Sequence, residues 1–142
     1  MTAKEQLVTV LRAFSDKEAL ARRESLFKAS EREQKVDETY QVISGWLAGI
    51  DGIDVKVVDG GQLPFMSTVF NAKHLQINLA KQTIQFNPVA TEENLFFTIV
   101  GLAQQDLRME SDFSVTLPSG LPGGFIQADM FYQQLAHRVL HS

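Results

Sequence analysis

The sequence predicts an α+β fold with a long N-terminal helical segment (a short helix, then a long one), a small antiparallel sheet of four or five strands, one internal helix and one C-terminal helix. Residues 1–52 carry 17 of the 30 charged residues, as a helix exposed to water would. Residues 53–142 are sparsely charged and alternate apolar with polar positions, as half-buried strands do. The chain of 142 residues has the length of one domain. We expect a helical arm over residues 1–50 and an α+β core over 53–142.

Composition excludes several classes of function. Thirteen Lys and Arg against 17 Asp and Glu give a net charge of −4, which argues against a nucleic-acid binder. The chain has no cysteine, so disulfides, thiolate metal sites and a cysteine nucleophile are excluded. No apolar run is long enough to cross a bilayer, and no targeting segment is visible. We therefore expect no membrane span and a cytosolic location.

The first helix is predicted over residues 1–14. Leu7, Leu11 and Phe14 recur at spacings of four and three, which places them on one helix face. The next four residues, 15–18, read Ser-Asp-Lys-Glu, the form of a capping box. We therefore expect a break near Ser15 and a second helix over 16–48, ended by Gly49 and Gly52.

The second helix carries an apolar seam formed by Val36, Tyr40, Ile43, Leu47 and Ile50. A helix of about 33 residues would span roughly 50 Å, whereas a compact chain of this size has a radius of gyration of about 14–15 Å. One end must therefore project, bend or pack on a second copy. We expect the seam to bind a partner through Val36, Tyr40, Ile43 and Leu47.

The middle of the chain predicts strands with one buried face. Residues 74–79 and 83–89 alternate apolar and polar, and the short link between them indicates a hairpin. The outward positions of this hairpin carry amides, a hydroxyl and a histidine but no full charge. Such a face can hydrogen-bond a protein without burying ions. We expect it to bind a partner through His74, Gln76, Asn78, Thr83, Gln85 and Asn87.

The internal helix is predicted to begin at Thr91, followed by two glutamates. A broad apolar face then runs from Leu95 to Leu107. After a strand over 113–117 and a segment rich in proline and glycine over 117–124, a last helix is expected at about 128–141.

These features together favour a non-catalytic protein-interaction module, an adaptor or regulatory protein whose partner is itself, as a homodimer, or another protein. The order helix, strands, helix, strands, helix in a small acidic chain resembles that of secretion-type chaperones. That resemblance implies dimerisation and binding of unfolded segments. The sequence predicts no cofactor, no metal site and no catalytic residue.

Two other functions remain open. An apolar ligand could occupy a pocket between sheet and helix, with walls drawn from Phe65, Phe70, Phe86, Phe96 and Phe125. A small hydrolase-type enzyme would need His74 beside a carboxylate in one cleft, and the candidate carboxylates are Asp59, Asp112 and Asp129.

Overall fold

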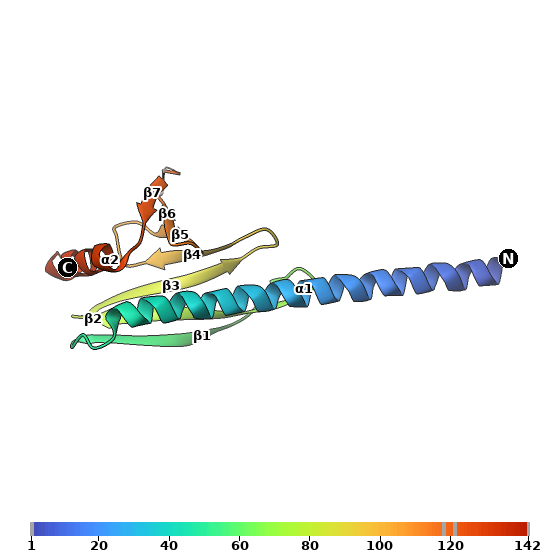
Figure 1. The fold of residues 1–142 in the computed structure, drawn as a ribbon, viewed down its shortest axis with the longest axis horizontal. Helices are drawn as coiled ribbons and strands as arrows, with labels where there is room; N and C mark the ends of the chain where they lie inside the picture. Colours follow the sequence, from blue (N-terminus) through green and yellow to red (C-terminus); the bar gives the residue numbers. More distant parts are fainter. Residues whose placement is uncertain (1, 118, 121, 142) are drawn as a thin grey trace.

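The structure, a computed structural model, describes residues 2–117, 119–120 and 122–141. It has an α+β fold with two helices and one antiparallel sheet of seven strands (Figure 1). The sheet thus has more strands than the four or five predicted. In chain order the elements are α1 (Ala3–Leu47), β1 (Ile53–Phe65), β2 (Thr68–Leu79), β3 (Gln82–Ala90), β4 (Leu95–Val100), β5 (Leu107–Glu110), β6 (Ser114–Thr116), β7 (Pro122–Phe125) and α2 (Ala128–Leu140).

The sheet is a simple meander in which each strand pairs with the next one along the chain. The predicted hairpin is confirmed as β2 and β3, which pair from Leu75 and Phe86 to Leu79 and Gln82. Its two-residue turn places both Ala80 and Lys81 at positive φ, 47° and 70°. This backbone matches the twist of a hairpin even without the Asn-Gly sequence that usually supplies it.

The predicted break near Ser15 is wrong, because α1 is one continuous helix. A capping box does form at its true start, where Thr2 and Glu5 exchange side-chain to backbone hydrogen bonds. No proline interrupts α1, and its first glycine is Gly45, so nothing after Ser15 disfavours helix strongly enough to stop it. The predicted end is confirmed, since α1 stops at Leu47 and Gly49 has φ +79°.

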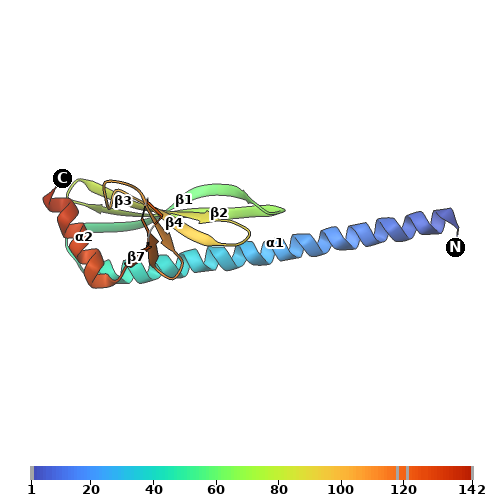
Figure 2. The ribbon, with the colours of Figure 1, turned by 90° about the horizontal axis from the view of Figure 1, so that it is seen from above.

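Only the second half of α1 is packed on the sheet. Figures 1 and 2 show the first half projecting well past the ends of the strands. All residues from Ala3 to Glu24 are exposed except the half-buried Ala19, and Ser25 is the first buried residue. The helical arm expected over residues 1–50 is therefore free only in its first part, and from here on we call residues 3–24 the arm. At 1.5 Å per residue the arm is roughly 33 Å long.

The predicted internal helix is also wrong. Residues 95–100 form strand β4 and residues 107–110 form β5. Within β4, Leu95, Phe97 and Ile99 are buried while the residues between them are half-buried. The apolar stretch is broad because both faces of strand β4 carry mostly apolar residues. Its aromatic and β-branched residues favour that extended state.

Strand β7 overlaps the segment over 117–124 that we predicted as a loop rich in proline and glycine. It pairs with β6 across a register shift. Gly124 lies at φ +81°, a conformation that glycine adopts at no steric cost. Two residues of that predicted loop, Pro118 and Leu121, lie outside the described residues.

Both helices pack on the same face of the sheet. Phe131 of α2 meets Trp46 of α1 and Phe86 of β3, with ring centroids 5.9 and 6.1 Å apart. Tyr40 of α1 meets Phe97 of β4 at 5.7 Å. The C-terminal helix predicted at 128–141 is confirmed at 128–140. Phe131 and Leu135 are its buried residues.

Helix α1 also closes a gap in the sheet. Strands β2 and β3 pair only as far as Leu75 and Phe86, so the earlier part of β2 has an open edge. The Tyr40 hydroxyl donates to the Lys73 carbonyl at 2.6 Å and lies 3.2 Å from the Phe86 carbonyl. The Asn71 backbone N–H donates to the Glu33 carboxylate at 2.6 Å. Side chains of α1 thus pair backbone groups that a neighbouring strand would otherwise pair.

Candidate interaction surfaces

The arm carries an exposed apolar stripe that the helix geometry aligns with the core. Leu7 and Leu11 lie 18 residues, about five turns, before the buried Ser25 and Ala29. They therefore point to the same side of α1. Leu11 is 56% exposed and Phe14 60%. We call this surface the arm stripe, formed by Leu7, Val10, Leu11 and Phe14.

The seam that we expected to bind a partner is filled by the chain's own sheet. Val36, Tyr40, Ile43 and Leu47 are all buried and belong to the hydrophobic core. The periodicity of these four residues correctly indicated a packed helix face, but Ile50, the fifth member of the predicted seam, follows the end of α1 and is exposed. The sequence did not reveal that the sheet of the same subunit covers it, while the earlier turns of the same face stay open.

The predicted polar face of the hairpin is present and points away from both helices. Residues directly opposite in an antiparallel pair share a face. Successive residues of a strand point to opposite faces. His74, Gln76 and Asn78 therefore lie on the face opposite to the buried Leu75, Ile77 and Leu79. We call the whole surface the amide face; it comprises His74, Gln76, Asn78, Thr83, Gln85 and Asn87.

Hydrogen bonds between side chains order the amide face. Gln76 donates to Gln85 at 3.3 Å, and Gln85 donates to Asn87 at 2.6 Å. Thr83 donates to Asn78 at 2.8 Å. Polar side chains held in this way present donors and acceptors in fixed positions, which lowers the entropy lost when a partner binds.

The amide face continues onto β4 through residues that we did not predict. The strand pairing places Val100 opposite Gln85 and Thr98 opposite Asn87. We did not predict these residues as part of the face because we expected a helix over residues 95–107. The alternation of burial in β4 is the signal that identifies them, but the sequence Leu-Phe-Phe-Thr-Ile-Val contains only one polar residue.

His74 is packed against the backbone of Gly60. A Cβ placed on Gly60 would lie 2.1 Å from Nε2 of His74 and 3.1 Å from the Ala72 carbonyl oxygen. Gly60 belongs to the bulge where β1 has one residue more than β2. The bulge therefore fixes where the imidazole sits at the margin of the amide face.

We expect Gly60→Ala to lower the free energy of unfolding by about 1–2 kcal/mol, because the added methyl group overlaps the His74 ring. Urea unfolding measures this loss. The same substitution in a His74→Ala background should cost clearly less, since the ring is gone. An equal loss in both backgrounds would show that the imidazole does not pack there.

The five phenylalanines proposed as pocket walls do not surround one cavity. Phe65, Phe70 and Phe86 are buried in the core. Phe96 is half-buried beneath the Arg108 guanidinium, whose carbon lies 3.7 Å from the ring centroid, and Phe125 is exposed. These rings contribute mainly to packing and to the surface.

A pocket open to solvent lies elsewhere, between α2 and the loop after β4. Its volume is about 600 Å³. Leu102 and Met130 give it apolar walls, and Gln134, His137 and Arg138 give it polar ones. It contains none of the predicted phenylalanines, so it does not match the apolar pocket that we expected.

The residues considered for an enzyme do not come together. Val58 lies directly opposite His74 in the β1–β2 pair, so Asp59 points to the other face of the sheet. Asp112 lies in the turn between β5 and β6, and Asp129 lies in the first turn of α2. The four residues thus lie on four different parts of the fold: β2, β1, the β5–β6 turn and α2.

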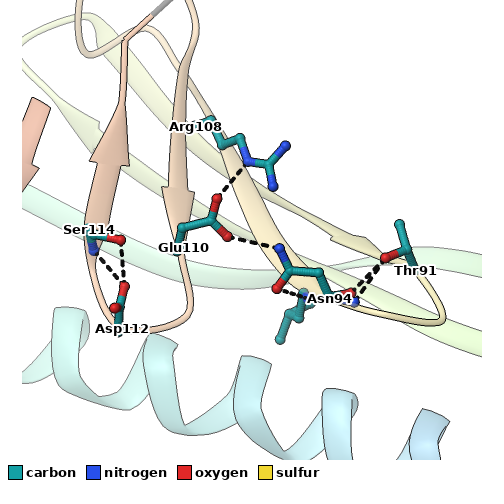
Figure 3. A network of polar contacts seen from close by, with 7 residues as sticks. Thr91, Asn94, Arg108, Glu110, Asp112 and Ser114 are labelled. Carbon is teal, nitrogen blue, oxygen red and sulfur yellow. Dashed lines mark hydrogen bonds and ion pairs between the residues drawn. The ribbon is translucent and has the colours of Figure 1, made fainter. Parts of the chain in front are cut away.

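The acidic residues near β5 and β6 are engaged by the chain itself (Figure 3). Glu110 accepts hydrogen bonds from Arg108 Nε at 2.7 Å and from Asn94 Nδ2 at 3.1 Å. The Ser114 hydroxyl and backbone N–H both donate to Asp112, and these bonds lower the pKa of that carboxyl. These contacts are those of a structural turn.

Among residues 2–117, 119–120 and 122–141, no three His, Asp or Glu side chains are grouped so as to hold a metal ion. The rings of His137 and His141 lie 4.3 Å apart at the end of α2. Within the same ranges, no helix combines the length and hydrophobicity needed to cross a bilayer.

Comparison of the chain with protein-family models, with curated proteins and with solved structures finds no match. The order of elements that suggested secretion-type chaperones is not the observed one, because the internal helix is replaced by strands. The arm stripe and the amide face therefore carry the functional argument.

Proposed function

We propose that the protein is a non-catalytic interaction module that forms a homodimer through its arm and offers its amide face to another protein. One observation carries this proposal. The helix face that is buried from Ser25 to Leu47 continues through the arm as an apolar stripe that nothing in the described part of the subunit covers.

The arm lacks the packing that stabilises most protein helices. In proteins most helical stability comes from tertiary packing of an amphipathic face rather than from intrinsic propensity. The arm has a strong N-cap at Thr2 but no buried residue before Ser25. Pairing of its stripe with a second copy would supply the missing packing and remove four large apolar side chains from water.

The amide face suits a second role as a docking surface. It is uncharged, and no helix in the described part of the chain covers it. A partner that binds there does not have to strip water from buried ions. In a dimer formed through the arms, each subunit would keep this face free, so two copies of a further protein could be held at once. A dimer that holds two copies of another protein in this way would act as an adaptor.

Leu11→Gln tests the proposal. We expect wild-type protein to form a dimer in sedimentation equilibrium at micromolar concentrations. The substitution should raise its dissociation constant at least about tenfold, because each copy loses a central apolar contact.

Leu20→Gln is the matched control. Leu20 is 64% exposed, against 56% for Leu11. It lies nine residues further along α1, about two and a half turns, and so points to the opposite side. We expect this variant to dimerise like wild type. A monomeric wild-type protein, or equal weakening by both substitutions, would contradict the proposal.

A further inference from the structure

The arm stripe has opposite charges at its two ends. Lys4 lies about one turn before Leu7, and Glu18 lies about one turn after Phe14. Positions 4, 7, 11, 14 and 18 follow spacings of three and four residues, so all five share one side of the helix. From position 4 to position 18 this side runs from a cation through apolar residues to an anion, and Arg22 follows on the same side one turn later.

This polarity decides between the two ways in which a second copy could lie against the arm. Parallel helices in register would place Lys4 beside Lys4 and Glu18 beside Glu18, and both contacts are repulsive. Antiparallel helices place Lys4 of each copy beside Glu18 of the other. Charged residues that flank an apolar seam set orientation in helix pairs by this means.

We propose that two copies pair antiparallel through the arm stripe, about a two-fold axis near Leu11, with Lys4 of each copy facing Glu18 of the other. This inference rests on the proposed homodimer and specifies its geometry. The midpoint of positions 4 and 18 is position 11, so Leu11 meets its own counterpart at the centre. A contact of this kind uses the same patch on both subunits and is closed at two copies.

The position of the sheet is compatible with this register. With Leu11 at the centre, the N-terminal end of the partner's helix lies near position 20 of the arm. The first buried residue of α1 is Ser25, whose hydroxyl lies 2.7 Å from that of Ser67 in the β1–β2 turn. About five residues of α1, roughly 7 Å, separate the end of the partner's helix from Ser25. The β1–β2 turn borders the last turn of this overlap, where Ser67 lines one open pocket with Glu18, Ala21 and Arg22, and the two sheets lie at opposite ends of the dimer.

Disulfide trapping tests this arrangement. Because the chain contains no cysteine, only the introduced cysteines can form disulfides. We compare Lys4→Cys alone, Glu18→Cys alone and an equal mixture of the two, under mild oxidation above the dissociation constant. The antiparallel pair predicts several-fold more linked dimer in the mixture than in either single variant. Leu11→Cys, at the centre, should link to itself and serves as the positive control.

Charge reversal gives an independent readout. Lys4→Glu and Glu18→Lys should each weaken dimerisation several-fold in low salt, and the double variant should recover wild-type affinity. A parallel pair predicts no such rescue, because like residues face one another in every variant.

Two results would overturn the antiparallel arrangement while leaving the homodimer intact. One is a Lys4→Cys variant that links to itself as efficiently as it links to Glu18→Cys. The other is a dimer in which neither the mixture nor Leu11→Cys links. Sedimentation as a monomer at every concentration would overturn the homodimer itself.

Discussion

Replacing Phe131 by alanine is expected to lower the free energy of unfolding by about 3–5 kcal/mol. The ring is fully buried and lies between Trp46 of α1 and Phe86 of β3. It therefore joins the C-terminal helix to both of the other layers. Truncation would remove the ring from the core and leave a cavity where three elements meet.

Urea unfolding followed by circular dichroism measures this effect, and Phe27→Ala is the control. Phe27 belongs to α1 but is 67% exposed, so its truncation should change stability by less than about 1 kcal/mol. A loss below about 1 kcal/mol for Phe131→Ala would show that α2 does not pack on the sheet as described.

Tyr40→Ala should have an effect of similar size, about 3–5 kcal/mol, and for two separable reasons. The ring packs on Phe97, and the hydroxyl bonds the Lys73 carbonyl on the open edge of β2. Tyr40→Phe keeps the ring and removes only the hydroxyl, so it should cost about 1–3 kcal/mol by leaving backbone oxygen unpaired. If Tyr40→Phe is as stable as wild type, the hydroxyl does not close the gap between β2 and β3.

Alkaline pH gives Tyr40 a second signature. Burial raises the pKa of its hydroxyl above the ordinary value of 10.0, because the phenolate would lose its hydration. Above pH 10 the unfolded chain releases this proton while the folded chain retains it. The contribution of Tyr40 to stability is therefore full below pH 10 and falls as pH rises further, by up to about 1.4 kcal/mol per pH unit. The difference in unfolding free energy between wild type and Tyr40→Phe should accordingly shrink above pH 10, and a constant difference would contradict this account.

Periodicity predicted the elements whose two faces differ clearly. The hairpin of β2 and β3 alternates apolar residues with amides, and the face of α2 repeats Phe131 and Leu135 at one turn. In both cases one side contacts the core and the other contacts water, so the alternation of apolar and polar residues indicates which positions are buried.

The prediction was wrong where local signals competed. Residues 15–18 have the form of a capping box, but such a box starts a helix only where the preceding residues are not already helical. In residues 95–100, nearly every residue is apolar, so neither the helical nor the strand period stands out. The sheet pairing then decides the conformation through contacts with β3 and β5, which lie outside any local window.

The candidate site was predicted in part. The amide face was identified because uncharged polar residues at alternate positions are a local pattern. The arm stripe was visible at Leu7, Leu11 and Phe14, yet the stronger seam from Val36 to Leu47 attracted the partner prediction. Only the three-dimensional arrangement shows that the sheet covers the stronger seam and ends before the weaker one.

Hydrogen exchange of the arm amides at several protein concentrations tests the central claim most directly. Proteolytic fragments resolve residues 3–24 from the sheet, so each region reports on itself. We expect protection of the arm to rise with concentration across the micromolar range, while protection of β2 to β4 stays constant. Arm amides that exchange at one rate at every concentration, whether fast or slow, would contradict pairing of the stripe with a second copy.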